Sequence, residues 1–267
     1  MSGSGTFNSV SFAEGRFRRA YMGTYTTPWE KFGQKCVVKE LKESYTWKAT
    51  DWDSTVEVHR EAQRLAEGFN QYIQCLKINY PIKFTDIAVN RVTSRLDYGT
   101  PKLNEYVVVE DYIPGDFKKW CNNYGYISAE VSFAKAMPAF AHWSWWYTKG
   151  EKMIADLQGV RSDNGYTLTD PVLMSGSVDG RQYGCTDTGI EGIAMFFLNH
   201  KCNELCNNLP KPTLYSLGIP QSQIQSVTQQ LQAIMNATAY SHELKLPYAI
   251  RSRLVEPLKA TARGYGY

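Results

Sequence analysis

The sequence predicts an α+β fold divided into two lobes. Its 267 residues are 43% hydrophobic, enough to bury one large core or one core per lobe. The first hundred or so residues mix strand-like and helix-like segments, and the strongest strand signal in the chain ends at a Pro-Gly-Asp break, 114–116. We therefore expect four parts: a flexible leader over 1–10, a β-rich N-lobe over 11–113, a C-lobe over 114–210, and a C-terminal helical extension over 211–267 that packs on the C-lobe.

Three segments define the expected N-lobe. Residues 35–41, KCVVKEL, form a short β-branched run typical of a strand, and 104–113, NEYVVVEDYI, is a stronger one. Between them, 56–73 is charged and has apolar residues at helical spacing, so we expect an amphipathic helix. The residues on its apolar face are Val58, Ala62, Leu65 and Phe69.

The expected C-lobe contains helices, one buried strand and two loops. An aromatic helix is predicted over 132–150, and a buried strand over 151–160 carries Asp156 at its end. A polar loop follows over 161–171, and a glycine-bearing loop runs into a helix over 184–200. The Gln-rich segment 221–237 is predicted to be a further helix that packs on the C-lobe.

Composition and charge argue against several classes of partner. Lys and Arg number 29 against 26 Asp and Glu, a net charge of +3, so no nucleic acid partner is expected. The sequence contains no run of eighteen apolar residues, so no membrane-spanning helix is expected. The start, MSGSGTFNSV, lacks the basic and apolar regions of a signal peptide, so we expect a cytoplasmic protein. In that reducing compartment its six cysteines are thiols or metal ligands.

His200, Cys202 and Cys206 form an H-x-C-x-x-x-C cluster at the end of an apolar run. On one continuous helix His200 and Cys202 would point about 200° apart, so they share an ion only if the helix ends near His200. Asn203 would then cap a new turn. The fourth ligand we choose is His142, in the aromatic helix. The spacing also allows a second interpretation, in which both cysteines are small core residues and both histidines bind carbonyls.

Several motifs, in order along about residues 12–210, resemble those of the alpha-kinases, a family of atypical protein kinases. They are FAEGRFRRAY, VVKE, VVVEDYIPGDFKKWCNNYG, FAHWSW, ADLQGV, TDP, GCTDTGIEG and FFLNHKCNELC. The resemblance implies a bilobal fold distantly like that of ordinary protein kinases, with ATP bound between the lobes. It also implies a structural Zn²⁺ in the C-lobe held by His142, His200, Cys202 and Cys206.

The resemblance assigns the phosphate-binding role to two basic residues. Lys39, after a β-branched run, would pair with the phosphates of ATP, and Arg18 would contact them. Arg16 and Arg19 compete for the second role, and a solvated lysine at a strand end would look the same as Lys39. Glu61 on the following helix would orient Lys39 through an ion pair, or would be an ordinary exposed glutamate.

Asp156, Gln158 and Asp170 form the expected catalytic core. A carboxylate after an apolar strand is costly unless it has a partner or a task. The resemblance makes Asp156 the catalytic aspartate that faces the substrate hydroxyl, and Gln158 and Asp170 the Mg²⁺ ligands, which offer hard oxygens. The loop between them is several residues longer than is usual in the family, and this makes Asp163 a rival ligand. As ordinary structural residues, the two aspartates would be turn formers.

Two further groups are expected at the nucleotide. Glu110 and Tyr112 end the strong strand where a kinase hinge binds adenine, mainly through backbone groups. Thr186, Asp187 and Gly189 belong to a glycine-bearing loop that enters a helix, an arrangement that presents amides to phosphate. This loop lacks the Gly-Lys-Ser/Thr ending of a P-loop.

The sequence thus predicts an enzyme that transfers the γ-phosphoryl group of Mg-ATP to Ser or Thr of a protein substrate. Two alternatives compete with it. One is a pseudokinase that binds nucleotide without turnover, and the other is a zinc-stabilised interaction domain that shares only the fold. A zinc hydrolase is a more distant alternative, because protein residues fill all four expected ligand positions.

Overall fold

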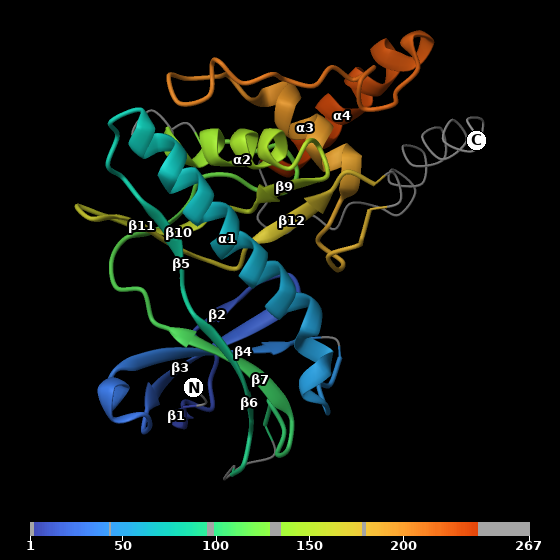
Figure 1. The fold of residues 1–267 in the computed structure, drawn as a ribbon. Helices are drawn as coiled ribbons and strands as arrows, with labels where there is room; N and C mark the ends of the chain where they lie inside the picture. The colour runs from blue at the N-terminus through green and yellow to red at the C-terminus, as the bar shows by residue number, and fades with distance from the viewer. Residues whose placement is uncertain (1–2, 43, 95–98, 129–134, 178–179, 240–267) are drawn as a thin grey trace. The chain divides into compact units, whose positions relative to one another are not determined.

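The computed structural model describes residues 3–42, 44–94, 99–128, 135–177 and 180–239. The chain divides into two compact units. The first unit comprises Met1–His59 and Phe84–Gly115, and the second comprises Arg60–Lys83 and Asp116–Tyr267. The second unit therefore includes residues 60–83, a segment that the sequence interpretation placed in the N-lobe. Figure 1 shows the elements with their labels.

A six-stranded antiparallel sheet forms the first unit (Figure 1). Its strand order is β1-β3-β4-β7-β6, with β2 pairing only with β3. The strands are β1 (Gly5–Phe7), β2 (Ala13–Glu14), β3 (Arg18–Tyr25), β4 (Lys35–Leu41), β6 (Ile87–Arg91) and β7 (Tyr106–Asp111). Strand β1 lies inside the segment expected to be a flexible leader. It is ordered because its backbone groups pair with the edge of β3, where Gly5 faces Tyr25.

A hydrophobic core cluster of the first unit lies on one face of this sheet. Alternate residues of β3, β4 and β7 point to one face, as the two-residue period of a strand requires. The cluster consists of Tyr21, Tyr25, Cys36, Val38, Val92, Val107 and Val109. Two short 3-10 turns, η1 (Trp29–Lys31) and η2 (Ala49–Trp52), connect the elements of this unit.

Helix α1 (Asp53–Cys75) starts in the first unit and continues in the second. Its predicted apolar face is confirmed, because Val58, Ala62, Leu65 and Phe69 are all buried. In the second unit this face packs on the aromatic helix α2 (Ala136–Tyr147). The ring centroids of Phe69 and Phe140 are 5.2 Å apart.

The second unit contains two small antiparallel sheets and three more helices. One sheet has the order β5-β11-β10-β8, and the other pairs β12 with β9. The strands are β5 (Ile82–Phe84), β8 (Phe117–Lys119), β9 (Lys152–Ala155), β10 (Gln158–Ser162), β11 (Gly165–Thr169) and β12 (Val172–Ser175). Besides α2, the helices are α3 (Gly189–Asn199) and α4 (Ile224–Ala239), and the 3-10 turn η4 (Gln221–Gln223) precedes α4.

Two sequence-based expectations for this unit need correction. The expected strand over 151–160 is two strands, β9 and β10, because Asp156 between them adopts a left-handed backbone with φ 56°. The expected loop over 161–171 contains strand β11. Only two apolar residues of this strand, Tyr166 and Leu168, alternate with polar ones, and this short pattern was overlooked; both are buried.

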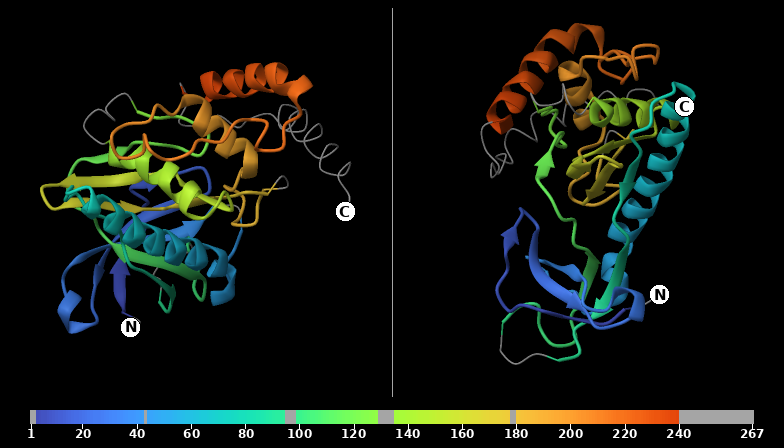
Figure 2. Two further views of the ribbon diagram at one scale, coloured as in Figure 1. Left: turned by 45° about the horizontal axis from the view of Figure 1, so that its top comes forward. Right: turned by 90° about the vertical axis from the view of Figure 1, so that its left-hand side faces the viewer.

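Helix α4 packs beside α3, as Figure 2 also shows. Ala194 and Met195 of α3 form a core cluster with Ile219, Val227 and Leu231. The Gln-rich segment is thus helical as expected. The rest of the predicted C-terminal extension, 240–267, and residues 132–134 of the predicted aromatic helix lie outside the described residues. Within the described part, no helix has the length and apolar character needed to cross a lipid bilayer.

Candidate active site

The first unit gathers three of the predicted residues on one face of its sheet. In the antiparallel register Lys39 is opposite Ala20 and Arg18 is opposite Leu41, so both side chains leave the sheet on the same side. Glu110 is opposite Val37, which places it on that side as well. The sheet therefore brings Arg18, Lys39 and Glu110 to one surface.

Lys39 pairs with Glu110, not with the partner expected from the sequence. The Lys39 Nζ atom lies 2.5 Å from Glu110 Oε1, and both side chains are almost fully buried. Glu61, the expected partner, instead lies 2.8 Å from Arg64 Nε and 2.9 Å from Lys152 Nζ. These two cations hold the pKa of Glu61 at about 2, with the Arg64 hydrogen bond as the largest cause.

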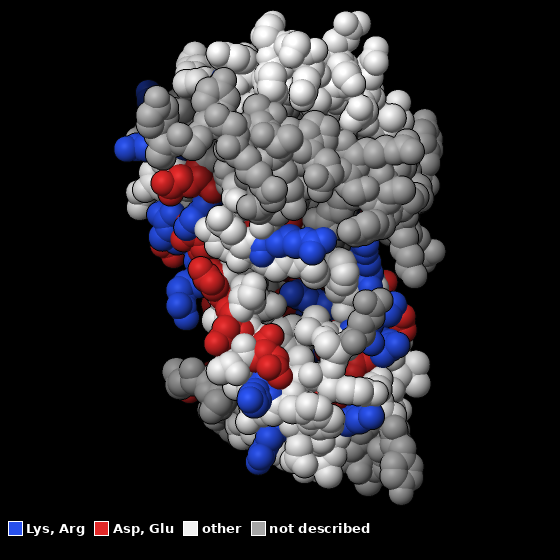
Figure 3. All heavy atoms as spheres, turned by 90° about the vertical axis from the view of Figure 1, so that its right-hand side faces the viewer, with Lys and Arg blue, Asp and Glu red and all other residues white. Residues whose placement is uncertain are grey.

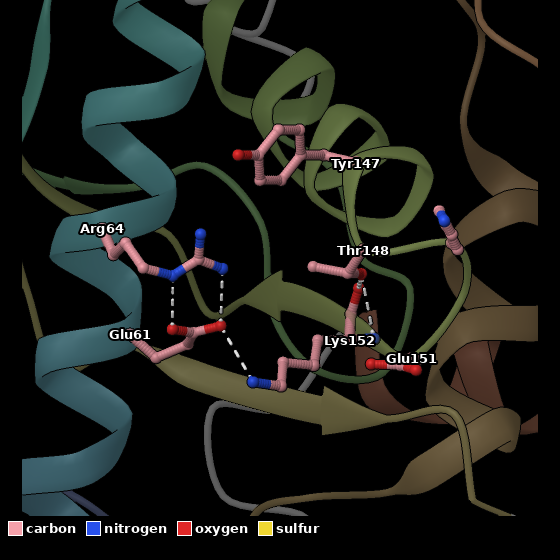
Figure 4. A pocket seen from close by; sticks show the side chains of 7 residues that line it. Glu61, Arg64, Tyr147, Thr148, Glu151 and Lys152 are labelled. Carbon is pink, nitrogen blue, oxygen red and sulfur yellow. Dashed lines mark hydrogen bonds and ion pairs between the residues drawn. The ribbon is translucent and has the colours of Figure 1, made fainter.

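The Glu61 network lines a cavity of about 330 Å³ in the second unit. Figure 4 shows the Glu61 carboxylate between Arg64 and Lys152, with Tyr147 and Thr148 on the opposite wall. Arg64 also lies over the Tyr147 ring, with its Cζ atom 5.8 Å from the ring centroid. Because the Glu61 carboxylate is already paired with two cations, it links helix α1 to strand β9 within the second unit.

The register also separates Arg18 from its competitor Arg19. Arg19 is opposite Glu40 on the other face of the sheet, and its Nη1 atom lies 3.1 Å from Glu40 Oε1. Arg18 Nη2 donates to Thr55 Oγ1 at 3.1 Å, and its guanidinium lies over the Trp52 ring. Arg18 therefore shares a face with Lys39, whereas Arg19 does not.

The two predicted adenine-binding residues have largely occupied backbones. Glu110 lies inside strand β7, which is paired on both sides. The Tyr112 amide donates to the Lys35 carbonyl at 3.2 Å. The amides of these two residues are therefore engaged within the protein, and adenine binding through backbone groups of this segment stays a prediction.

In the second unit, two antiparallel pairings bracket Asp156 and Asp170. The register partners on either side are Ala155 with Val172 and Gln158 with Thr169. The two-residue breaks at 156–157 and 170–171 therefore face each other. Both aspartates have a left-handed backbone, with φ 56° and 49°, which Asp tolerates better than most residues. The fold thus places the backbones of two aspartates that are fourteen positions apart in the numbering opposite each other.

Gln158 completes this constellation. Its Nε2 atom donates to Asp156 Oδ2 at 3.2 Å, so its carbonyl oxygen is the atom left to accept a cation. Gly159, the next residue, has φ 152°, and a Cβ there would lie 2.1 Å from the Thr167 carbonyl oxygen. Glycine is thus required for β10 to approach β11 closely and to hold Gln158 in place.

Lys119 is the residue of this constellation that the sequence interpretation missed. It is opposite Gln158 in the β8–β10 pairing, and its Nζ atom lies 2.8 Å from Asp156 Oδ1. The only sequence signal was a pair of lysines in the segment GDFKKW after the Pro-Gly break. Asp163, the rival metal ligand, is exposed in the turn at the far end of the β10–β11 hairpin, away from Gln158.

The glycine-bearing loop is organised around Asp187, which is fully buried. Its carboxylate accepts hydrogen bonds from four donors: Ser175 N at 3.0 Å, Ser175 Oγ at 2.8 Å, Gly189 N at 2.8 Å and Tyr183 N at 3.3 Å. The Thr186 carbonyl accepts from Asn123 Nδ2 at 2.9 Å. The contacts of Asp187 are thus those of a residue that shapes the loop, although it was expected near the nucleotide.

His142, His200, Cys202 and Cys206 converge in the second unit, with one ligand atom from each lying within 4.8 Å of the others. Helix α3 ends at Asn199, and His200 has an extended backbone, as sharing an ion requires. The Asn203 side chain accepts from the Leu205 amide at 2.9 Å and so caps the turn that holds Cys206.

Distances and chemistry at this cluster fit a closed zinc site. The Cys202 Sγ–His142 Nδ1 distance is 3.7 Å and the Cys206 Sγ–His200 Nε2 distance is 3.5 Å. Tetrahedral Zn²⁺ with ordinary bond lengths separates N and S ligands by about 3.5 Å. His142 Nε2 donates to the Pro210 carbonyl at 2.9 Å, which leaves Nδ1 for a metal. Burial lowers the pKa of His200 to about 3 and raises that of Cys206 to about 12.

Comparison with known proteins places the chain in a class. The alpha-kinase family model matches residues 13–206. The alpha-protein kinase vwkA of Dictyostelium discoideum is 28% identical over 200 residues, which are 74% of this chain and 30% of that protein. A solved alpha kinase from Entamoeba histolytica has a TM-score of 0.63 and 27% identity over 78% of this chain and 80% of its own. The alpha-kinase domain of myosin-II heavy chain kinase A, solved with AMP-PNP, has the same fold, with a TM-score of 0.63 and 23% identity over 79% of this chain and 89% of its own.

The fold and the family match define the class of this chain as an alpha-kinase domain. The chain belongs to the alpha-kinase family. It spans less than a third of the length of the vwkA relative. On the face drawn in Figure 3, Lys and Arg of the described residues lie interspersed with Asp and Glu, so charge of one sign does not dominate there.

Proposed function

We propose that this chain is a catalytic domain that transfers the γ-phosphoryl group of ATP to Ser or Thr hydroxyls of proteins with Mg²⁺ as cofactor. The observation that supports the proposal is that the strand breaks carrying Asp156 and Asp170 face each other, with Gln158 bonded to Asp156. Two carboxylates and an amide oxygen suit a hard cation and a hydroxyl that must be oriented.

Each residue has one role in this proposal. Lys39 and Arg18, on one face of their sheet, hold the phosphates. Gln158, through its carbonyl oxygen, and Asp170 would hold Mg²⁺, which neutralises phosphate charge when bound. Asp156 positions the acceptor hydroxyl. The Lys119 ammonium, 2.8 Å from Asp156 Oδ1, keeps that carboxylate oriented.

The cysteine and histidine cluster supports a second cofactor, a structural Zn²⁺ held by His142, His200, Cys202 and Cys206. All four ligand positions come from the protein, which is the pattern of structural zinc. The metal would tie α2 to the segment after α3 and add to the stability of the second unit. We expect about one zinc per purified chain by elemental analysis, and a reduced content in Cys206→Ser. Zinc-free protein of unchanged thermal stability would contradict the assignment.

The phosphotransfer proposal is tested with [γ-³²P]ATP, Mg²⁺ and a Ser/Thr-containing basic protein as acceptor. We expect label in the acceptor with the parent chain and a loss of at least about a hundredfold with Asp156→Asn. Asp163→Asn, at the exposed hairpin tip, is the matched control and retains the parent rate. Equal labelling by Asp156→Asn and the parent would reject the catalytic role. Nucleotide binding without any labelling by the parent would favour a module without turnover.

A further inference from the structure

Four buried polar side chains in the first unit form one connected series that ends at Lys39. They are His59, Thr85, Glu110 and Lys39, and each is at most 5% exposed. Lys39 Nζ contacts Glu110 Oε1, and the other carboxylate oxygen, Oε2, accepts from Thr85 Oγ1 at 3.0 Å. His59 Nε2 contacts the Thr85 carbonyl oxygen. Buried polar groups are costly unless they are paired, so a connected set of this kind restricts each member to one geometry.

Local structure explains how Thr85 reaches the carboxylate. Thr85 lies between β5 and β6, two residues before Ile87, and Ile87 is the register partner of Glu110 in the β6–β7 pairing. The Thr85 hydroxyl therefore approaches Glu110 from the segment just before β6. The two oxygens of one carboxylate are thus divided between Lys39 on one side and Thr85 on the other.

His59 fixes Thr85 in turn. A carbonyl oxygen only accepts hydrogen bonds, so the Nε2 atom of His59 must carry the proton that it shares with the Thr85 carbonyl. The imidazole also contacts the ring of Phe84, with centroids 5.9 Å apart in an edge-on arrangement. Helix α1, which carries His59, thereby holds the backbone of Thr85 in place.

We propose that Thr85 is a positioning residue for nucleotide binding, acting on Lys39 through Glu110, with His59 as its support. The inference rests on the proposed role of Lys39 as the phosphate-binding lysine. The Thr85 hydroxyl fixes the rotation of the carboxylate and takes up part of its charge. The Lys39 ammonium is then held in one direction without being fully neutralised.

The test compares Thr85→Val, which keeps the shape and removes the hydroxyl, with Thr85→Ser, which keeps the hydroxyl. We expect Thr85→Val to raise the KM for ATP about tenfold, the size of one hydrogen bond to a charged group. Because Lys39 binds phosphate before and during transfer, kcat should stay within about threefold. Thr85→Ser should restore the parent KM within about twofold. Thr24→Val, an exposed threonine on β3, is the control and should match the parent.

Each remaining outcome decides the question. An unchanged KM for ATP in Thr85→Val, or a Thr85→Ser as impaired as Thr85→Val, would overturn the inference, because the hydroxyl would then not be the active group. If Thr85→Val does not fold, Thr85→Cys replaces it, since a thiol is only a weak donor, and an unchanged KM there is equally decisive. Lys39→Met separates the two proposals. If it leaves the KM for ATP unaltered, the proposed role of Lys39 fails and the inference fails with it. If Lys39→Met raises the KM and Thr85→Val does not, only the inference fails.

Discussion

Replacing Asp187 by alanine should destabilise the second unit far more than removal of an ordinary acidic residue. The carboxylate is fully buried, and four donors point at it. The substitution leaves the Ser175 and Gly189 amides, at 3.0 and 2.8 Å, without their acceptor. The Ser175 hydroxyl can rotate, whereas the two amides cannot, and the Tyr183 amide, at 3.3 Å, is the most distant of the four donors.

The expected loss follows from these contacts. A buried donor without a partner costs about 1–3 kcal/mol, so two amides together cost about 4 kcal/mol. Domains are stable by only about 5–15 kcal/mol, so this is a large fraction of the total. For a domain of this size the midpoint of thermal unfolding should fall by about 8–16 °C.

Thermal unfolding followed by circular dichroism measures this effect, with urea unfolding as an independent value. Asp187→Asn keeps one acceptor oxygen and turns an amide toward the other donors, so it should lose less stability than Asp187→Ala. Asp163→Ala, an exposed acid in the same unit, should change the free energy of unfolding by no more than about 0.5 kcal/mol. An Asp187→Ala variant that unfolds within about 2 °C of the parent would refute the structural role.

Three further predictions concern the other contacts. Gly159→Ala should lower both the midpoint of thermal unfolding and the rate of phosphotransfer, because its Cβ would lie 2.1 Å from a backbone oxygen. Gly33→Ala is the control: Gly33 also has a positive φ but lies in open space, so only backbone strain of about 1 kcal/mol is expected. Lys119→Met should lower kcat about a hundredfold with little change in stability. Lys118→Met, which replaces a partly exposed lysine, should retain the parent rate. Equal rates for the two variants would count against the Lys119 contact. The pKa of Glu61 is lowered to about 2, so its stabilisation is complete above about pH 4.5 and is lost as the pH falls toward 2. Glu61→Gln should therefore cost on the order of 1 kcal/mol at neutral pH, allowing for the exposure of its partners, and progressively less as the pH falls through 2. A difference in urea unfolding that does not change with pH would contradict the ion pairs.

Local patterns in the sequence predicted most of the elements correctly. The β-branched run 35–41 is strand β4 with the same bounds, and the apolar spacing within 56–73 correctly identified the buried face of α1. These predictions succeeded because side-chain periodicity reflects burial on one face of an element. The same reasoning overlooked strand β11, where only two apolar residues alternate with polar ones. It also joined β9 to β10 across Asp156, because a left-handed backbone leaves no mark in hydrophobicity.

What the sequence by itself determined was the set of chemically suited residues and their order: a lysine after a strand, the Asp-Leu-Gln-Gly segment, and histidines and cysteines at close spacing. The tertiary structure decided which of them meet. It paired Lys39 with Glu110 instead of Glu61, brought Lys119 to Asp156, and enclosed Asp187 among donors from its own loop and from β12. The physical reason is that strand register and helix packing bring together residues that are distant in the chain, whereas a pattern along the sequence describes only neighbours.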